Sequence, residues 1–174
     1  MWRKRRQRKL NLGGRMIVRF ATMADLDQVL KLTQAFYAGT EGKVGVDLDE
    51  KSVMERVRDE IENHIGFVLE NDGDIVGMFG GYLTSMYANK HIKVFMETTW
   101  YVKPAHRGHS FELLRDAEKL LISMNIDKMI IGQWNIGERE RFEKVYARKG
   151  FELFEQHYIK ELKHENSERH SKTV

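Results

Sequence analysis

The sequence contains no cysteine, and this absence excludes several kinds of chemistry. Without thiols the chain can form neither a disulfide framework nor a thiolate metal site, and no cysteine nucleophile is available. Long apolar runs are also missing, because none approaches the roughly 18 residues that a membrane helix needs. The arginine-rich start lacks the apolar region of a signal peptide. We therefore expect a soluble protein that stays in the cytoplasm.

Acidic residues are missing from the first fifteen positions, which hold seven lysines and arginines. The whole chain has 29 basic and 26 acidic residues, so removing these seven leaves 22 basic against 26 acidic residues, a net charge of −4. Residues 1–15 thus form a basic tail on a mildly acidic body. One interpretation is a disordered arm that neutralises phosphates. The other is a translated leader before a true start at Met16, because Gly13-Gly14-Arg15 can be encoded by a purine-rich ribosome-binding sequence.

The remaining composition is that of an ordinary globular protein. Of the 174 residues, 41% are hydrophobic and 32% are charged, which is far from the composition of disordered chains. A compact domain has about 100 to 200 residues, so we predict a single domain over residues 16–163 and a polar tail over 164–174. The seven histidines show no spacing typical of metal ligands, and we expect no metal.

Hydrophobic periodicity predicts an α+β domain with one mixed sheet. Helical spacing predicts four helices, at residues 22–38, 49–61, 110–124 and 138–149. Alternation and short apolar runs predict seven strands, at residues 16–21, 67–69, 75–83, 94–102, 128–132, 151–155 and 157–162. The Asp72-Gly73 pair predicts a hairpin turn, and the glycines of the following strand predict a bulge or a close backbone approach.

The segment from Lys103 to Ser110 joins a predicted strand to a predicted helix. Backbone N–H groups at a helix start point to one place and attract phosphate. Arg107 adds a cation, Gly108 allows close approach, and Ser110 can cap the helix or donate a hydroxyl. His109 is a further candidate for a phosphate contact. These residues predict a phosphate-binding turn.

The element order and several motifs together resemble the GNAT superfamily of acyl-CoA-dependent N-acyltransferases, and most of all its bacterial and phage-encoded members. The motifs are GDIVGMFGGYL, ETTWYVKPAHRG, IIG, VYARKGF and HYIKEL. The resemblance covers Met16 to Leu162. One departure is clear: the family's phosphate loop usually reads Arg or Gln, two residues, Gly, one residue, and Gly or Ala. Counted from Arg107, this sequence has Ser110 and Glu112 at the two glycine places.

The resemblance implies a central, mixed and mostly antiparallel sheet of about seven strands flanked by about four helices. It also implies acetyl-CoA as co-substrate, with the strand over 94–102 lending its backbone to the pantetheine arm and the turn holding the pyrophosphate. Carried over to this sequence, the implied cofactor-binding residues are Tyr101, Val102, Lys103, Arg107, Gly108, His109, Ser110, Phe111 and Asn135.

Two residues are candidates for proton transfer. Strand alternation puts Glu97 on one face with Thr99 and Tyr101, beside the implied thioester, so Glu97 is the candidate general base. A surface or structural carboxylate is the alternative. Tyr146 matches the tyrosine that in the family protonates the departing sulfur, and a core aromatic packed against Phe142 is its alternative.

The sequence therefore predicts an N-acetyltransferase that acts on a primary amine of a small molecule, peptide or protein. The alternative is a catalytically silent GNAT-like module that binds a partner, with the basic arm gripping nucleic acid. Acceptor pockets are expected around residues 39–48 and 86–91. The acceptor itself cannot be read from the residues, and a homodimer stays open.

Overall fold

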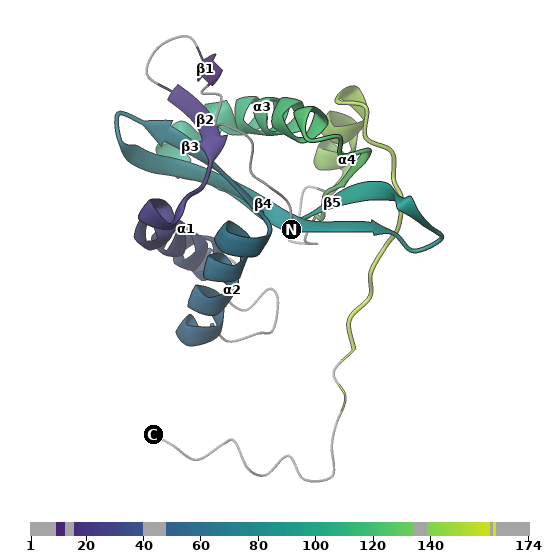
Figure 1. The fold of residues 1–174 in the computed structure, drawn as a ribbon, viewed down its shortest axis with the longest axis horizontal. Coiled ribbons are helices and arrows are strands. Elements are labelled where there is room, and N and C mark those ends of the chain that lie inside the picture. The colour runs from purple at the N-terminus through teal and green to yellow at the C-terminus, as the bar shows by residue number, and fades with distance from the viewer. Residues whose placement is uncertain (1–9, 13–15, 40–47, 134–138, 161, 163–174) are drawn as a thin grey trace. The chain divides into compact units, whose positions relative to one another are not determined.

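The computed structural model describes residues 10–12, 16–39, 48–133, 139–160 and 162 (Figure 1). It divides into two compact units, Met1–Ile136 and Gly137–Val174, and each is described by itself. The first unit holds the sheet and three of the described α-helices, and the second holds the fourth. Within the described residues, no helix is long and apolar enough to cross a membrane.

The first unit is built on a six-stranded sheet in which neighbours in sequence are also neighbours in space. All pairs are antiparallel except the last, which is parallel, as expected where a helix connects two strands of one sheet. In sheet order the strands are β1 (Leu10–Leu12), β2 (Met16–Phe20), β3 (Ile65–Asn71), β4 (Asp74–Met86), β5 (Asn89–Val102) and β6 (Lys128–Ile130).

Helices cover both faces of this sheet (Figure 1). On one face lie α1 (Leu26–Ala38), which follows the short 3-10 helix η1 (Met23–Asp25), and α2 (Glu50–Asn63). The other face carries α3 (Ser110–Ser123), which continues directly from the 3-10 helix η2 (Pro104–His109). In the second unit, α4 spans Arg139–Arg148.

Two apolar layers hold the helices on the sheet. Under α1 and α2, a buried cluster joins helix residues to residues of β3 and β4: Ala21, Val29, Leu32, Val57, Ile61, Val68, Ile75 and Met78. Under α3 the contacts are aromatic, and they run from Phe67, Phe79 and Phe95 to Trp100 and then Phe111. Phe67, Phe79 and Phe95 are fully buried, so truncating any one of them to Ala would cost about 3 to 5 kcal/mol.

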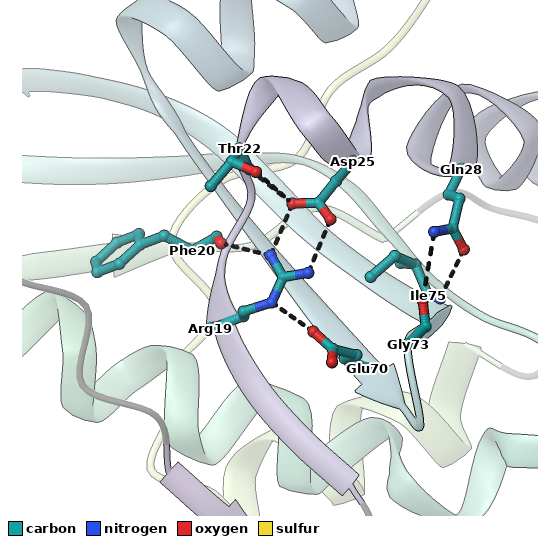
Figure 2. Close-up of polar contacts among 8 residues, drawn as sticks. All are labelled: Arg19, Phe20, Thr22, Asp25, Gln28, Glu70, Gly73 and Ile75. Atoms are coloured by element: carbon teal, nitrogen blue, oxygen red, sulfur yellow. Dashed lines mark hydrogen bonds and ion pairs between the residues drawn. The ribbon is translucent and has the colours of Figure 1, made fainter.

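A polar cluster at the start of α1 fixes this helix to the sheet (Figure 2). Arg19 of β2 donates to both carboxylate oxygens of Asp25 at 2.7 Å and to Glu70 of β3 at 2.6 Å. Burial alone would raise the pKa of Asp25, but hydrogen bonds from Arg19 and Thr22 outweigh it and lower that pKa. Gln28 of α1 in turn accepts from the backbone N–H of Ile75 at 2.9 Å. These bonds join the helix to three strands.

The hairpin turn predicted between β3 and β4 is confirmed. Asp72 and Gly73 both have positive φ, at 51° and 91°, which is the geometry of a two-residue turn that matches the twist of a hairpin. The four predicted helices are also present, with somewhat different ends.

The strand prediction is wrong at both ends of the chain. Leu10–Leu12 form β1 and pair with β2, so these three residues of the expected disordered tail are part of the sheet. The strands predicted at 151–155 and 157–162 are not found among the described residues there, since 151–160 and 162 form neither strand nor helix. Six strands are described instead of seven. The rest of the basic tail, residues 1–9 and 13–15, lies outside the described residues, so its nucleic-acid role stays a prediction.

Candidate active site

A β-bulge in the middle of the sheet is the centre of the candidate site. Between β4 and β5, Gly80 pairs with Thr99 but Gly81 pairs with Glu97, so Thr98 is an extra residue in β5. A Cβ at Gly81 would overlap the carbonyl oxygen of Met96, and only glycine allows this close approach. The bulge predicted from the glycines of β4 is thus confirmed.

The bulge corrects one prediction about Glu97. Side chains alternate between the two faces only in an uninterrupted strand, and the extra residue breaks the alternation between Glu97 and Thr99. Thr99 and Tyr101 do share the face that carries α1 and α2, since Thr99 contacts Glu60 and Tyr101 packs against Phe36. Glu97 instead turns towards the segment after β6.

Glu97 lies where β5 and β6 separate. Its Oε2 accepts a hydrogen bond from the backbone N–H of Gly132 at 2.9 Å. Burial raises the pKa of Glu97 from 4.5 to about 7, and the bond from Gly132 opposes this only in part. A general base works best when its pKa lies near the operating pH. Its position and pKa suit a general base.

Beyond Glu97 one edge of β5 is open. β6 pairs only with Val94–Met96, whereas β5 continues to Val102 and pairs there with β4 alone among the described strands. Backbone N–H and C=O groups at such an edge are available to an extended ligand. The resemblance implies this contact for a pantetheine arm.

A second carboxyl group, which sequence reasoning missed, lies on the other side of the bulge. Glu60 of α2 accepts from the hydroxyl of Thr98 at 3.2 Å and from that of Thr99 at 3.4 Å. Burial raises the pKa of Glu60 to about 7, the two hydroxyls lower it, and the negative charge of Glu97 raises it further. A Cβ at Gly80 would overlap the Glu60 Oε1 atom, so the glycine makes room for this carboxyl group.

The predicted phosphate turn has a different form in the structure. The helical run begins at Pro104, six residues before α3, and Ser110 donates its backbone N–H to the carbonyl of Arg107. Inside a 3-10 helix the N–H groups are bonded three residues back, so the amides of Arg107 to Ser110 are not the free helix start that we predicted. Ser110 is the first residue of α3 rather than its cap, since His109 is the cap residue.

Cationic side chains gather on η2 instead. Lys103 and Arg107 are exposed, and Gly108 has open space around it. The Nδ1 atom of His109 lies 2.7 Å from a carboxylate oxygen of Glu112, so the acid at the place of a family glycine is paired with a neighbouring histidine. An anion at η2 would therefore be held by side-chain charge.

The other predicted cofactor residues contribute mainly packing. The ring of Tyr101 lies 6.2 Å from that of Phe36, and Val102 is buried. Lys103 donates its backbone N–H to Val76 at 2.8 Å, and Phe111 packs its ring against Trp100. Hydrogen-bonded pairs alternate along an antiparallel ladder, so the bond from Lys103 puts the backbone groups of Tyr101 on the β4 side as well, and those of Val102 face the open edge.

Two predicted site residues lie outside the part of the first unit that the structure describes. Tyr146 lies on α4 in the second unit, where its ring is 6.1 Å from that of Phe142 and 5.9 Å from that of Phe151. This local packing agrees with the alternative interpretation of Tyr146, an aromatic residue packed against Phe142. Asn135 lies outside the described residues. The roles of both stay predictions.

Comparison with known proteins identifies the fold and the family. A sequence model described as the acetyltransferase (GNAT) family matches residues 26–151. No curated protein matches the chain significantly. Among solved structures, an aminoglycoside N-acetyltransferase, AAC(6')-Iy in complex with CoA, superposes with a TM-score of 0.66 at 17% identity, covering 88% of this chain and 98% of that chain.

Two further structures have the same fold. A predicted acetyltransferase with acetyl-CoA from Clostridium acetobutylicum gives a TM-score of 0.64 at 17% identity and covers 84% of this chain and 96% of its own. A ribosomal-protein-alanine N-acetyltransferase from Brucella melitensis biovar Abortus 2308 gives 0.64 at 12% identity, with 84% and 99% covered. Since the family match spans well over half of the chain, the protein belongs to the GNAT family of acetyltransferases, acyltransferases that move an acetyl group from acetyl-CoA to an amine.

Proposed function

We propose that this protein transfers the acetyl group of acetyl-CoA to a primary amine by direct attack, with Glu97 as the general base. The observation that carries the proposal is the position of Glu97: a carboxyl group with a pKa of about 7 lies at the point where β5 leaves β6. No other described carboxyl group has both the raised pKa and access to this opening.

The proposed reaction has one proton acceptor and one proton donor. Glu97 takes one proton from the ammonium form of the amine, and the neutral nitrogen then forms a bond to the thioester carbonyl carbon as the carbon–sulfur bond breaks. The second proton that the nitrogen loses as the amide forms replaces the one that the proton donor gives to the sulfur. The departing thiolate needs a proton, and we assign this step to Tyr146 on the strength of the family motif VYARKGF. No covalent enzyme intermediate is required.

We also propose how the chain holds the co-substrate. The open β5 edge, up to Val102, offers backbone groups to the pantetheine arm. Lys103 and Arg107, both exposed at η2, supply positive charge for the pyrophosphate. Because side-chain charge, rather than backbone N–H groups, would hold the pyrophosphate, the affinity for acetyl-CoA should fall strongly as the salt concentration rises.

The test is acetyl-CoA binding followed by turnover with a panel of primary amines, read as release of the free thiol. Binding is measured as thermal stabilisation of the purified protein by acetyl-CoA. We expect stabilisation and thiol release with wild-type protein. Absence of stabilisation at millimolar acetyl-CoA would favour the silent-module alternative.

E97Q is the variant that tests the base. The substitution keeps an oxygen that can accept the Gly132 N–H and removes only the proton-accepting carboxylate, so acetyl-CoA binding should be unchanged while turnover falls. Turnover that stays unchanged across pH in E97Q would remove Glu97 from the mechanism.

A further inference from the structure

We propose that Glu60 binds the acceptor as its ammonium ion, on the face of the bulge that carries α1 and α2. This inference rests on the proposed function and deepens it, because it names the residue that receives the acceptor and the class of acceptor that it receives. In this arrangement Glu60 binds the cationic acceptor, and Glu97 accepts a proton from it.

The surroundings of Glu60 lack a positive charge. Its carboxyl group is held by two hydroxyl groups, those of Thr98 and Thr99, at 3.2 and 3.4 Å. Among the residues that the structure describes, no lysine, arginine or histidine lies within ion-pair distance of it. A carboxylate withdrawn from water without a cation is unfavourable. An ammonium ion would give this carboxylate the cationic partner that the described residues do not supply.

The nearest cation of α2 is engaged elsewhere. Arg56, one helical turn before Glu60, donates from its Nη1 atom to the hydroxyl of Tyr82 at 2.8 Å. Tyr37 of α1 is within electrostatic reach of Arg56, Tyr82 and Glu60, and burial raises its pKa. Arg56 and the two tyrosines therefore form a polar wall beside the carboxyl group without neutralising it.

The hollow beside Glu60 is apolar apart from a few groups. It is small, with room for about one water-sized group, and it is partly open to solvent. Of the lining residues that the structure describes, Glu60 alone is ionisable, and Thr33 and Thr99 provide the hydroxyl groups, among Val29, Val57, Ile61, Met78 and Phe79. The hydroxyl of Thr33 is already bonded to the carbonyl of Val29 at 3.0 Å. A hollow of this size and lining fits the ammonium group of a primary amine, while the aliphatic stem stays on the side open to solvent.

Electrostatics couples this site to the base. The charge of Glu97 raises the pKa of Glu60, so the two carboxylates repel each other when both are ionised. A cation bound at Glu60 relieves that repulsion. When the acceptor leaves Glu60 for the opening beside Glu97, its ammonium group transfers one proton to the Glu97 carboxylate, which becomes a neutral carboxylic acid. The neutral amine, which now has a free electron pair, attacks the thioester carbonyl. The second proton that its nitrogen loses as the amide forms goes to the departing thiolate.

Steady-state kinetics of E60Q test the proposal. Charge-assisted hydrogen bonds contribute about 1.5 to 3 kcal/mol, so we expect KM for the amine to rise roughly 10- to 100-fold, while KM for acetyl-CoA stays unchanged. The matched control is E62Q, which removes a charge from an exposed position of the same helix and should behave as wild type. An unchanged KM for the amine in E60Q would overturn the proposal.

A binding experiment separates this inference from the proposed function. The probe is n-butylamine, which is an alkylammonium at neutral pH, with n-butanol as its uncharged counterpart. We expect butylammonium, and not butanol, to shift the NMR amide signals of Thr98 and Thr99 in wild-type protein and to have no such effect in E60Q. Equal shifts in both proteins overturn the docking role whether or not any amine is acetylated. Failure of the panel to release thiol overturns the transferase proposal alone.

A second variant guards against an unspecific effect of E60Q. G80A retains the glutamate but puts a Cβ where its Oε1 atom lies, so the carboxyl group must move away from the two threonines. We expect the same loss of butylammonium shifts as in E60Q. Retained shifts in folded G80A would contradict the geometry that we infer.

Discussion

Replacement of Glu60 by glutamine should stabilise the protein above neutral pH, although it removes a hydrogen-bonding carboxylate. Glu60 has a pKa of about 7 in the folded protein and about 4.5 otherwise. The folded state therefore binds more protons than the unfolded state between these values, so stability falls as the pH rises from 4.5 to 7. Each pKa unit corresponds to about 1.4 kcal/mol, which gives a cost of up to about 3 kcal/mol above pH 7.

The measurement is urea denaturation of wild type and E60Q at a series of pH values from 4 to 8. The two free energies of unfolding should be similar near pH 4, and the advantage of E60Q should grow through pH 5 to 7 and then level off. E62Q is the control, because Glu62 is exposed and should show no such trend. An E60Q variant that is no more stable than wild type at pH 8 would refute the reasoning, since the buried carboxylate would then not be a cost to folding.

Four further predictions concern other parts of the fold. E97Q should lower kcat by roughly 10²- to 10⁴-fold, and the rise of wild-type activity with pH through about 7, where Glu97 loses its proton, should disappear in a pH profile. R107A should weaken acetyl-CoA binding and reduce its salt dependence in titrations at two ionic strengths, whereas a neutral-to-neutral change such as S110A should do neither. R19M should lower the free energy of unfolding by about 3 to 5 kcal/mol, because Asp25 and Glu70 lose the guanidinium that they share; chemical denaturation at pH 7 measures this. G81A should destabilise by about 1 to 3 kcal/mol and abolish turnover together, because its Cβ would overlap the Met96 carbonyl; a stable, active G81A would show that the bulge is not needed.

The central elements could be predicted because each had a local cause. The turn at Asp72-Gly73 needs positive φ, which this pair adopts readily. The bulge was signalled by Gly80 and Gly81, since glycine inside a strand is costly without a reason. Glu97 was found as a charged residue in a half-buried strand.

Glu60 could have been found by the same logic applied to α2. It lies seven residues after Val53 and three after Val57, so helical spacing places it on the apolar side of the helix. A glutamate on that side contradicts the pattern of its own helix, and such conflicts concentrate at functional sites. Periodicity counted from the apolar residues of α2 alone does not reveal this exception.

Two differences between prediction and structure have different physical causes. The start of η2 could have been predicted, because proline prefers the first position of a helix. Pro104 is the first residue of the helical run. At residues 151–160 alternation alone was misleading, since a strand is stable only with a partner to pair with. Leu153, Tyr158 and Ile159 are instead exposed in the structure, and nothing in their pattern could reveal this.

One pair of glycines accounts for both carboxyl groups of the site. Because Gly81 lets β5 approach closely, β5 gains Thr98 as an extra residue, and the hydroxyls of Thr98 and Thr99 then reach the same carboxylate. Because Gly80 has no side chain, the carboxyl group of Glu60 can occupy that space.

The same register shift explains why the site is unfavourable for folding and useful for binding. The extra residue Thr98 ends the alternation that would have placed Glu97 on the face of Thr99, so Glu97 accepts a hydrogen bond from the backbone N–H of Gly132 instead. Two carboxyl groups with raised pKa values are thereby held on one bulge, and each would be easier to bury as a neutral residue. A bound cationic acceptor would offset the cost of burying these two charges. The site should therefore bind an ammonium ion more tightly than a neutral molecule of the same shape. If this is correct, the double variant E60Q/E97Q should be more stable than wild type at pH 8 by less than the sum of the single effects, because removing either charge already relieves their mutual repulsion.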